Sequence, residues 1–191
     1  VHSLTPVTLV GGARLDTVDL DACLMLAPTL VAADGGAGLL WQTGHRPVAV
    51  IGDMDSIPPA ARAAFADVLH EVAEQDSTDF DKALRGIGAP LILALGFTGG
   101  RLDHELAVLH SLAIRPAARC IVLGAETLAF LCPPRIALDL DPGTTVSLFP
   151  LAPVRVASTG LRWPTGHLTF SPLTRIGTSN EPRPHAYDPV T

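Results

Sequence analysis

The sequence predicts an α/β fold, in which a larger N-terminal domain built on a parallel sheet precedes a smaller C-terminal domain of antiparallel strands. Two observations carry this prediction. Short, continuously apolar runs alternate with helix-like segments from Pro6 to Ala118, and such runs are typical of a parallel sheet that is covered on both faces. After Cys120, proline and glycine interrupt the chain at roughly the 8- to 12-residue spacing of small antiparallel β domains.

Five strands are expected in the N-terminal domain, at residues 7–10, 30–33, 48–51, 68–72 and 91–95. The Ala-rich residues 60–65 lie between two of them and are expected to be helical. A first amphipathic helix, which ends at Gly86 to Gly88, is predicted by the spacing of four apolar side chains. The four apolar residues are Phe80, Ala83, Leu84 and Ile87. A second is predicted over 101–114, ending before Pro116, with one apolar face made of Leu102, Leu106, Leu109 and Ala113.

The domain boundary is expected at Pro133-Pro134, which gives domains of residues 1–132 and 133–191. Short runs at 145–149 and 168–170 are expected to be strands of the second domain. The last segment, 181–191, contains three prolines and no pattern. It is therefore expected to be either a frayed tail or a segment that is ordered by other contacts.

The composition excludes several classes of protein. A chain of 191 residues with 48% hydrophobic side chains can bury a substantial core, which excludes global disorder. Its longest apolar run is far shorter than the ~20 residues of a transmembrane helix, and a net charge of −6 argues against binding of a nucleic-acid backbone. The three cysteines match no zinc or redox pattern and are expected to be buried. The N-terminus does not resemble a signal peptide, so we expect a cytoplasmic protein.

The common phosphate-binding and hydrolase motifs are absent. The chain's one lysine, Lys82, follows Asp81 in a predicted helix rather than a Gly-rich loop, and Gly36-Ala37-Gly38 lacks the third glycine of a dinucleotide fingerprint. His104-Glu105 has no second histidine at the metalloprotease spacing, and no G-x-S-x-G occurs. The sequence therefore excludes P-loop, zincin and serine-hydrolase sites.

Four other motifs follow predicted strands, where α/β sheets bind ligands. The first is Asp34-Gly35-Gly36-Ala37. Its glycines would let backbone N–H groups approach a ligand, and Asp34 could accept hydrogen bonds from a ribose or a base. A tight strand-to-helix turn explains the same residues.

The second motif is Gly52-Asp53-Met54-Asp55-Ser56, in which two carboxylates lie two residues apart where a strand ends. One or two carboxylates, with water and phosphate oxygens, are what Mg²⁺ prefers. The alternative is that Asp55 or Ser56 caps the helix that begins near Pro58.

The third motif is residues 75–82, Gln-Asp-Ser-Thr-Asp-Phe-Asp-Lys. Asp76 as N-cap with Asp79 as its N3 partner would explain two of these residues. With the apolar stripe facing the core, Asp79 and Lys82 share an adjoining helix face. They could offer a metal ligand and a phosphate-binding ammonium side by side.

The fourth motif is the glycine-rich turn of residues 96–104, Gly-Phe-Thr-Gly-Gly-Arg-Leu-Asp-His, which opens a predicted helix. A helix N-terminus offers free N–H groups to an anion, and Arg101 adds a fork for phosphate oxygens. Asp103 could be a partner of the helix dipole, and His104 could be a packing residue. Carboxylates and an anion cradle on one sheet edge indicate a metal-nucleotide site.

Taken together and in this order, the four motifs resemble those of the thiamine pyrophosphokinase family. Residues 158–163, Ser-Thr-Gly-Leu-Arg-Trp, and 177–180, Gly-Thr-Ser-Asn, are similar to that family's β-domain motifs, so the resemblance covers nearly the whole chain. After Asn180 the family usually continues into further strands, whereas here Pro182, Pro184 and Pro189 resist strand formation.

The resemblance implies an α/β nucleotide-binding domain, a C-terminal β-sandwich, a homodimer, and transfer of diphosphate from ATP to thiamine with release of AMP. It implies that Asp53, Asp55 and Asp79 bind Mg²⁺ and, with Lys82, form the catalytic centre. It also implies a thiamine pocket built across two subunits, with Trp163 stacking on thiamine and Ser179 and Asn180 nearby. The residues expected around ATP are Asp34, Gly35, Gly36, Gln75, Asp76, Thr78, Thr98, Gly99, Gly100, Arg101, Asp103 and His104.

Three alternative functions, and one alternative role for Trp163, stay open at this point. The acceptor could be another hydroxymethyl heterocycle such as a pterin, which the residues from Gly160 onward would decide. The protein could be a nucleotide-binding sensor that transfers nothing, although three carboxylates and a lysine argue against it. It could also be a phosphatase that uses Asp53 and Asp55. Trp163 could equally be a core residue of the β domain.

Overall fold

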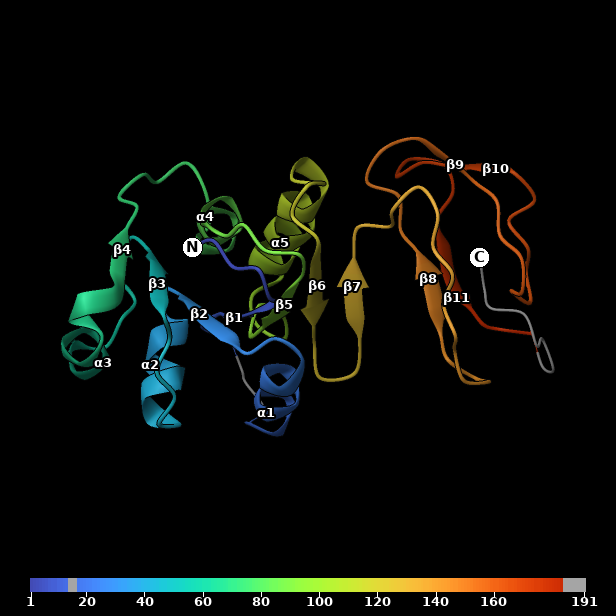
Figure 1. Ribbon diagram of the computed structural model, residues 1–191. Helices are drawn as coiled ribbons and strands as arrows, with labels where there is room; N and C mark the ends of the chain where they lie inside the picture. The colour runs from blue at the N-terminus through green and yellow to red at the C-terminus, as the bar shows by residue number, and fades with distance from the viewer. Residues whose placement is uncertain (14–16, 184–191) are drawn as a thin grey trace. The chain divides into compact units, whose positions relative to one another are not determined.

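The computed structural model describes residues 1–13 and 17–183. It consists of two compact units, Val1–Leu131 and Cys132–Thr191. Unit 1 is built on one seven-stranded sheet, and unit 2 contains two small antiparallel pairs of strands (Figure 1). The predicted fold class is therefore confirmed.

The sheet of unit 1 has the strand order β4-β3-β2-β1-β5-β6-β7, and all neighbours are parallel except β6 and β7. The five predicted strands are all present, each within two residues of its expected bounds, whereas β6 and β7 were not anticipated. The strands are β1 Val7–Val10, β2 Thr29–Ala33, β3 Ala49–Gly52, β4 Leu69–Glu71, β5 Ile92–Leu95, β6 Cys120–Leu123 and β7 Leu128–Phe130.

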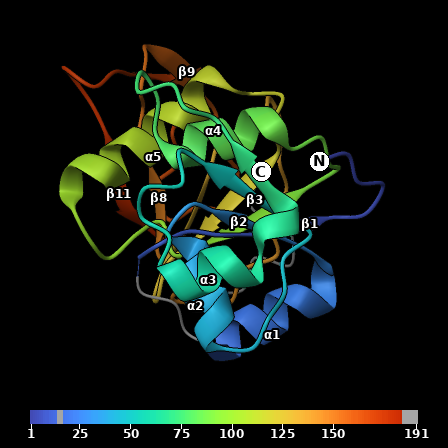
Figure 2. The same ribbon diagram turned by 90° about the vertical axis from the view of Figure 1, so that its left-hand side faces the viewer.

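Helices cover both faces of this sheet. Figure 2 shows α4 and α5 on one face and α1, α2 and α3 on the other. The helices are α1 Thr17–Leu26, α2 Gly36–Gln42, α3 Pro59–Ala64, α4 Asp79–Gly86 and α5 Leu102–Ile114, with a 3-10 turn at Ala66–Val68. Of these, α1 and α2 were not predicted as helices.

Alternate residues of the buried strands enter two separate cores. Val7 and Leu9 of β1 pack in the cluster that contains Phe80 and Leu84 of α4, whereas Val10 packs with Leu20 and Leu40 from the opposite face. Strands β1, β3 and β5 are buried at every position. This is why they are continuously apolar in the sequence.

The predicted core face of α5 is wrong. Leu102 is 69% exposed and Leu106 58% exposed, and α5 packs on the sheet through Val108 and Leu112 instead. Apolar side chains occur nearly all round this helix, so their spacing does not single out one face. For α4 the predicted apolar stripe is confirmed, since all four of its residues are buried.

Two smaller predictions also need correction. The N-cap of α4 is Thr78, whose side chain accepts a hydrogen bond from the backbone N–H of Asp81, so Asp76 does not cap this helix. Cys23 and Cys120 are buried as expected, but Cys132 is exposed.

Unit 2 contains β8 Val146–Leu148, β9 Val154–Val156, β10 Leu168–Phe170 and β11 Gly177–Asn180. Strand β8 pairs with β11 and β9 with β10, both antiparallel, so the two predicted runs are strands as expected. Pro182 forms an isolated antiparallel bridge with Leu161. The rest of the predicted tail, residues 184–191, lies outside the described residues.

Within the described part of the chain, no helix is long and apolar enough to cross a membrane.

Candidate active site

The predicted motifs meet at one edge of the sheet in unit 1. Asp34 follows β2, Asp53 follows β3, and Thr98 lies shortly after β5, so all three leave the carboxyl ends of parallel strands. The strand order reverses between β1 and β5. Ligands of open α/β sheets bind at this kind of topological switch point.

Two residues at this edge of the sheet that the sequence interpretation missed are Gly11 and Gly12, directly after β1. A Cβ on Gly11 would lie 2.5 Å from the carbonyl oxygen of Gly96, and a Cβ on Gly12 would lie 3.5 Å from Gly35. This turn therefore packs between the turns that follow β2 and β5. The dipeptide itself was the available signal, because glycine at a strand end permits close backbone approach.

Three carboxylates gather at the ends of β2 and β3. One oxygen from each of Asp34, Asp53 and Asp55 lies within 4.8 Å of the other two. Asp34 is 1% exposed; its Oδ2 accepts a hydrogen bond from the backbone N–H of Ser56 at 3.1 Å, while its buried Oδ1 has no partner among the described residues. The hydroxyl of Ser56 donates to Asp55 rather than capping a helix, and Pro58 precedes α3.

Gly52 makes the close approach of these acids possible. A Cβ at this position would lie 2.7 Å from the Cβ of Asp34 and 3.1 Å from Oδ1 of Asp79. Since a real Cβ almost never comes within 3 Å of another heavy atom, only glycine lets the carboxylate that follows β2 and the one that begins α4 meet across the end of β3.

Lys82 joins this cluster from α4. Its Nζ donates to Oδ2 of Asp53 at 2.9 Å and to Oδ1 of Asp79 at 3.3 Å, and its side chain is 1% exposed. Asp79 and Lys82 thus lie side by side on one helix face, as predicted. A buried ammonium needs such partners, because an unpaired charge there would be costly.

The electrostatics of the four groups differ. Burial raises the pKa of Asp34, and Asp79 adds to this rise, while burial also raises the pKa of Asp79. The hydrogen bond from Lys82 lowers the pKa of Asp53. Burial opposes the charged form of Lys82, but its bonds to Asp53 and Asp79 leave the pKa of the ammonium raised. The site thus concentrates negative charge around one fixed cation.

The loop between β4 and α4 contributes Gln75, whose Nε2 donates to Oδ2 of Asp53 at 3.2 Å. Thr78 is occupied as the N-cap of α4, and Asp76 is exposed in the loop. Asp81 does not enter the site. It forms a two-point ion pair with Arg115 at the end of α5.

The glycine-rich turn differs from the expected open anion cradle. Oε1 of Glu105 accepts the backbone N–H groups of Gly99 at 2.8 Å and Gly100 at 3.1 Å, so these donors are not free. Arg101 forms an ion pair with Asp103, and His104 is exposed. The preceding Phe97 packs on Phe80 of α4 with ring centroids 4.7 Å apart, which ties this turn to the helix of Lys82.

Unit 2 has its own cavity, of about 260 Å³, lined by Trp163, Asn180, Phe170 and other residues of its strands and turns. Trp163 is 55% exposed, so it is not a core residue. The backbone N–H of Trp163 donates to Oδ1 of Asn180, and Nδ2 of Asn180 donates back to the carbonyl of Trp163. Ser179 does not line the cavity; its backbone N–H donates to the hydroxyl of Ser147.

Comparison with known families assigns both units. The thiamin pyrophosphokinase catalytic domain matches residues 20–122, and the thiamin pyrophosphokinase vitamin B1 binding domain matches residues 135–187. The chain belongs to the thiamin pyrophosphokinase family. As a member of it, the chain is an ATP-dependent diphosphotransferase, so the predicted function is confirmed. The pterin-like acceptor and the nucleotide sensor find no support in these comparisons.

Individual thiamin pyrophosphokinases resemble this chain along most of its length. Thiamine pyrophosphokinase 3 of Oryza sativa subsp. japonica is 29% identical, over 81% of this chain and 71% of the rice protein. The crystal structure of thiamin pyrophosphokinase from Geobacillus thermodenitrificans is 26% identical, with a TM-score of 0.75 over 92% of this chain and 87% of that one. The enzyme from Candida albicans, 19% identical, shares the fold with a TM-score of 0.80 over 99% and 88% of the two chains.

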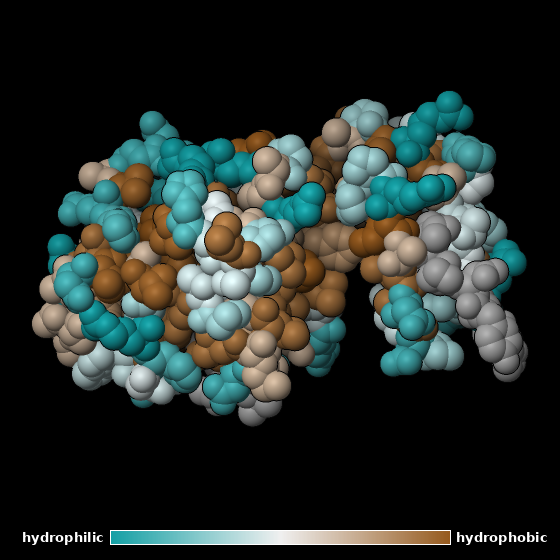
Figure 3. Space-filling model, viewed as in Figure 1, coloured by the Kyte–Doolittle hydropathy of each residue, from teal (hydrophilic) through white to brown (hydrophobic). Residues whose placement is uncertain are grey.

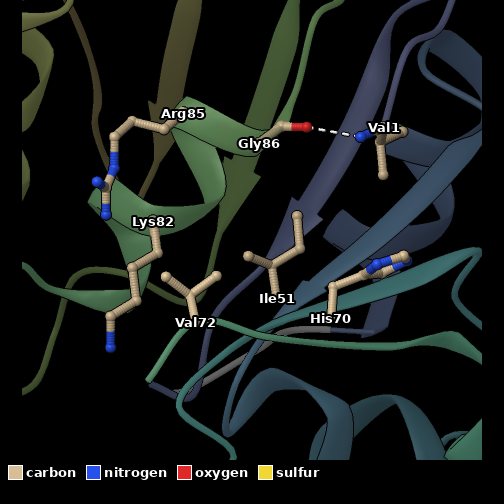
Figure 4. A pocket seen from close by; sticks show the side chains of 7 residues that line it. All are labelled: Val1, Ile51, His70, Val72, Lys82, Arg85 and Gly86. Atoms are coloured by element: carbon tan, nitrogen blue, oxygen red, sulfur yellow. Dashed lines mark hydrogen bonds between the residues drawn. The ribbon is translucent and has the colours of Figure 1, made fainter. Parts of the chain in front are cut away.

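Unit 1 also has a cavity, of about 330 Å³, which lies beside α4 (Figure 4). Its apolar lining comes from Val1, Ile51 and Val72. Lys82 also lines it, whereas none of the four carboxylates Asp34, Asp53, Asp55 and Asp79 does. We therefore place the candidate active site at the carboxylate cluster and not in this cavity.

Proposed function

We propose that the protein transfers the diphosphate of ATP to thiamine at the carboxylate cluster of unit 1. The observation that carries the proposal is the position of Lys82, whose buried ammonium bonds both Asp53 and Asp79 beside Asp34 and Asp55. In the reaction the hydroxyl oxygen of thiamine forms a bond to the β-phosphorus, the bond from that phosphorus to the α-phosphate oxygen breaks, and AMP and the hydroxyl proton leave.

The donor set fits Mg²⁺. Carboxylate oxygens are the ligands of this hard cation, and the buried Oδ1 of Asp34 lacks a protein partner among the described residues. We propose that Asp53, Asp55 and Asp79 bind the ion and that Asp34 contributes to the same site rather than to a ribose. When bound, Mg²⁺ would neutralise charge on the transferring phosphates.

Lys82 supplies a fixed positive charge next to the metal ligands. Because its pKa is raised, its ammonium stays charged at neutral pH and can attract phosphate oxygens without rearranging. Arg101 is held by Asp103 at the start of α5, and a phosphate would compete with that carboxylate for the guanidinium. The remaining predicted nucleotide contacts are Gly35, Gly36, Gln75, Asp76, Thr78, Thr98, Gly99, Gly100 and His104.

The acceptor is proposed to bind at Trp163. Arg162 lies 4.8 Å from the centroid of this ring and covers one face. Thiamine is a cation, so the other face of the indole is a suitable platform. Asn180, fixed by two hydrogen bonds to the Trp163 backbone, lies beside it. Ser179 is proposed as a further thiamine contact on the basis of the family resemblance.

A homodimer completes the proposal, with each thiamine pocket shared by two subunits. Apolar side chains stay exposed on unit 1, among them Leu102 and Leu106 of α5 and Leu128 of β7. Figure 3 shows apolar surface over β6 and β7 on the face in view. Exposed apolar patches of this kind mark interaction surfaces.

The direct test is incubation with ATP, Mg²⁺ and thiamine, followed by mass identification of the products. We expect AMP and thiamine diphosphate, formed only when thiamine is present. Formation of ADP or inorganic phosphate, or AMP at the same rate without thiamine, would show that the chain is not the proposed enzyme. A hydroxymethyl pterin offered in place of thiamine tests the other acceptor class.

A further inference from the structure

We propose that Arg85 is a positioning residue for the metal-nucleotide site, which it serves by fixing the loop that carries Gln75. The inference rests on the proposed function of the carboxylate cluster. Arg85 lies one turn after Lys82 on α4, and Figure 4 shows both side chains leaving the helix on the side away from Val1. The structure gives Arg85 no contact with any of the four clustered carboxylates, so its effect on them is indirect.

The loop, residues 72–78, has little backbone support of its own. It is anchored at its start by the N–H of Val72, which donates to the carbonyl of Gly52 at 2.7 Å, and at its end by the cap of Thr78 on α4. Between these points, residues 73–77 form no backbone–backbone hydrogen bond with the described parts of the chain. Their position therefore depends on side-chain contacts.

Arg85 provides those contacts. Its Nη2 donates to Oε1 of Glu74 and, at 2.9 Å, to the hydroxyl of Ser77, which itself donates to Glu74. Its Nε lies 3.4 Å from Oδ2 of Asp81, a carboxylate that Arg115 of α5 also clamps. One guanidinium thus ties Glu74 and Ser77 of the loop to α4, and Asp81 in turn pairs with Arg115.

The contact between Arg85 and Glu74 affects the active site because Glu74 is the residue directly before Gln75. The side-chain amide of Gln75 donates to Oδ2 of Asp53 at 3.2 Å. The same oxygen accepts from Lys82 at 2.9 Å. Release of Glu74 would let Gln75 move away from Asp53, and this carboxylate would keep only its bonds to Lys82 and to the backbone N–H of Asp55. The expected loss is in affinity for the metal and its nucleotide, and not in affinity for thiamine.

The test compares Arg85→Ala, Arg85→Lys and Glu74→Gln with the wild-type protein. The matched control is Arg46→Ala, since Arg46 forms a two-point ion pair with Asp67 on the same unit and touches none of the site residues. Calorimetry with α,β-methylene ATP and Mg²⁺ gives nucleotide affinity without turnover. Steady-state kinetics give KM for thiamine, and thermal unfolding gives Tm.

We expect Arg85→Ala and Glu74→Gln to weaken binding of the magnesium–analogue complex by about tenfold, the size of one lost charged hydrogen bond. KM for thiamine should stay within about twofold, Tm should match that of Arg46→Ala, and Arg85→Lys should recover part of the affinity. A variant that combines Arg85→Ala with Glu74→Gln should bind the analogue no more weakly than Arg85→Ala alone, because both changes break the same contact.

Wild-type affinity for the analogue in Arg85→Ala would overturn the proposal. So would a loss that is equal for the analogue and thiamine and accompanied by a lower Tm, because that pattern indicates a merely structural role. If Arg85→Ala fails to fold, Glu74→Gln alone decides in the same way. Absence of AMP formation by the wild type would instead count against the proposed function, and the binding comparison would still stand.

Discussion

Lys82 is the residue on which the chemistry of the site depends most clearly. Its side chain is almost fully buried, yet it is charged, because Asp53 and Asp79 both accept from its ammonium. The ammonium alone would be costly at this depth. Together with Asp34 and Asp55 these three groups leave a net negative site, which a divalent cation would balance.

Removal of any one proposed metal ligand should slow turnover strongly. We expect Asp53→Asn, Asp55→Asn and Asp79→Asn each to lower kcat by on the order of a hundredfold or more. Each change removes one negative charge from the ligands that hold the ion, and the ion stabilises the transferring group. The measurement is steady-state AMP formation at saturating Mg²⁺. Any variant with near-normal kcat identifies a residue that does not bind the ion.

Substitution of Trp163 should affect the binding of thiamine and not the binding of the nucleotide. A cation on an aromatic face is worth roughly 0.5 to 2 kcal/mol, so Trp163→Ala should weaken thiamine binding by ~2- to 30-fold and change ATP affinity by less than about twofold. Since the ring is 55% exposed, Tm should change little. Titration of both ligands checks this, and a variant that melts normally and binds thiamine as tightly as the parent would refute stacking.

Helix α4 makes three sets of contacts along its length. Lys82 and Asp79 face the active site, the apolar stripe faces the sheet, and Asp81 pairs with Arg115 of α5. The hydrogen bond from Arg115 is the main cause of the lowered pKa of Asp81. This ion pair therefore joins the two helices that cover one face of the sheet.

The ion pair between Asp81 and Arg115 should make the free energy of unfolding depend on pH in the acid range. A carboxylate whose folded pKa lies below its unfolded value of about 3.9 stabilises the fold above that pH and loses this contribution as the pH falls through the folded value. Asp81→Asn should cost about 1.5–3 kcal/mol at pH 7 and flatten the decline below about pH 4. Denaturant unfolding from pH 7 to pH 3 measures both; curves that stay parallel would contradict this role.

Across the whole chain, the sequence predicted those parts that local patterns determine. The buried strands are continuously apolar because both their faces are covered, and α4 has a clear stripe. By contrast, α5 is apolar nearly all round, so Val108 and Leu112 could not be chosen over Leu102 and Leu106. Strand β6 was not anticipated, and its pairing with β5 is a long-range contact.

The site shows the same division. The order of the motifs predicted which residues lie at the sheet edge, and the helical spacing predicted that Asp79 and Lys82 are neighbours. No local pattern could show that the buried Asp34 lies close to Asp53 and Asp55, because this depends on the pairing of β2 with β3 and on the glycine at position 52. Nor could it show that Glu105 occupies the N–H groups of the glycine turn.

The assembly state can be tested on the intact protein. We expect sedimentation equilibrium to give twice the 19.9 kDa of one chain, since exposed Leu102, Leu106 and Leu128 form apolar surface that association would cover. Leu106→Glu should shift the equilibrium toward monomer while leaving the fold intact. A wild-type protein that sediments as a single chain at micromolar concentration contradicts the proposed homodimer.

The measurement that bears most directly on the carboxylate cluster is binding of Mn²⁺, as a spin-active substitute for Mg²⁺, in the presence of α,β-methylene ATP. Electron paramagnetic resonance counts the free ion. The site described here predicts saturable binding by the wild type, weakened by about tenfold or more in Asp53→Asn and in Asp79→Asn, with Arg46→Ala unchanged. Equal Mn²⁺ affinity in the wild type and both aspartate variants would show that these carboxylates do not hold the metal.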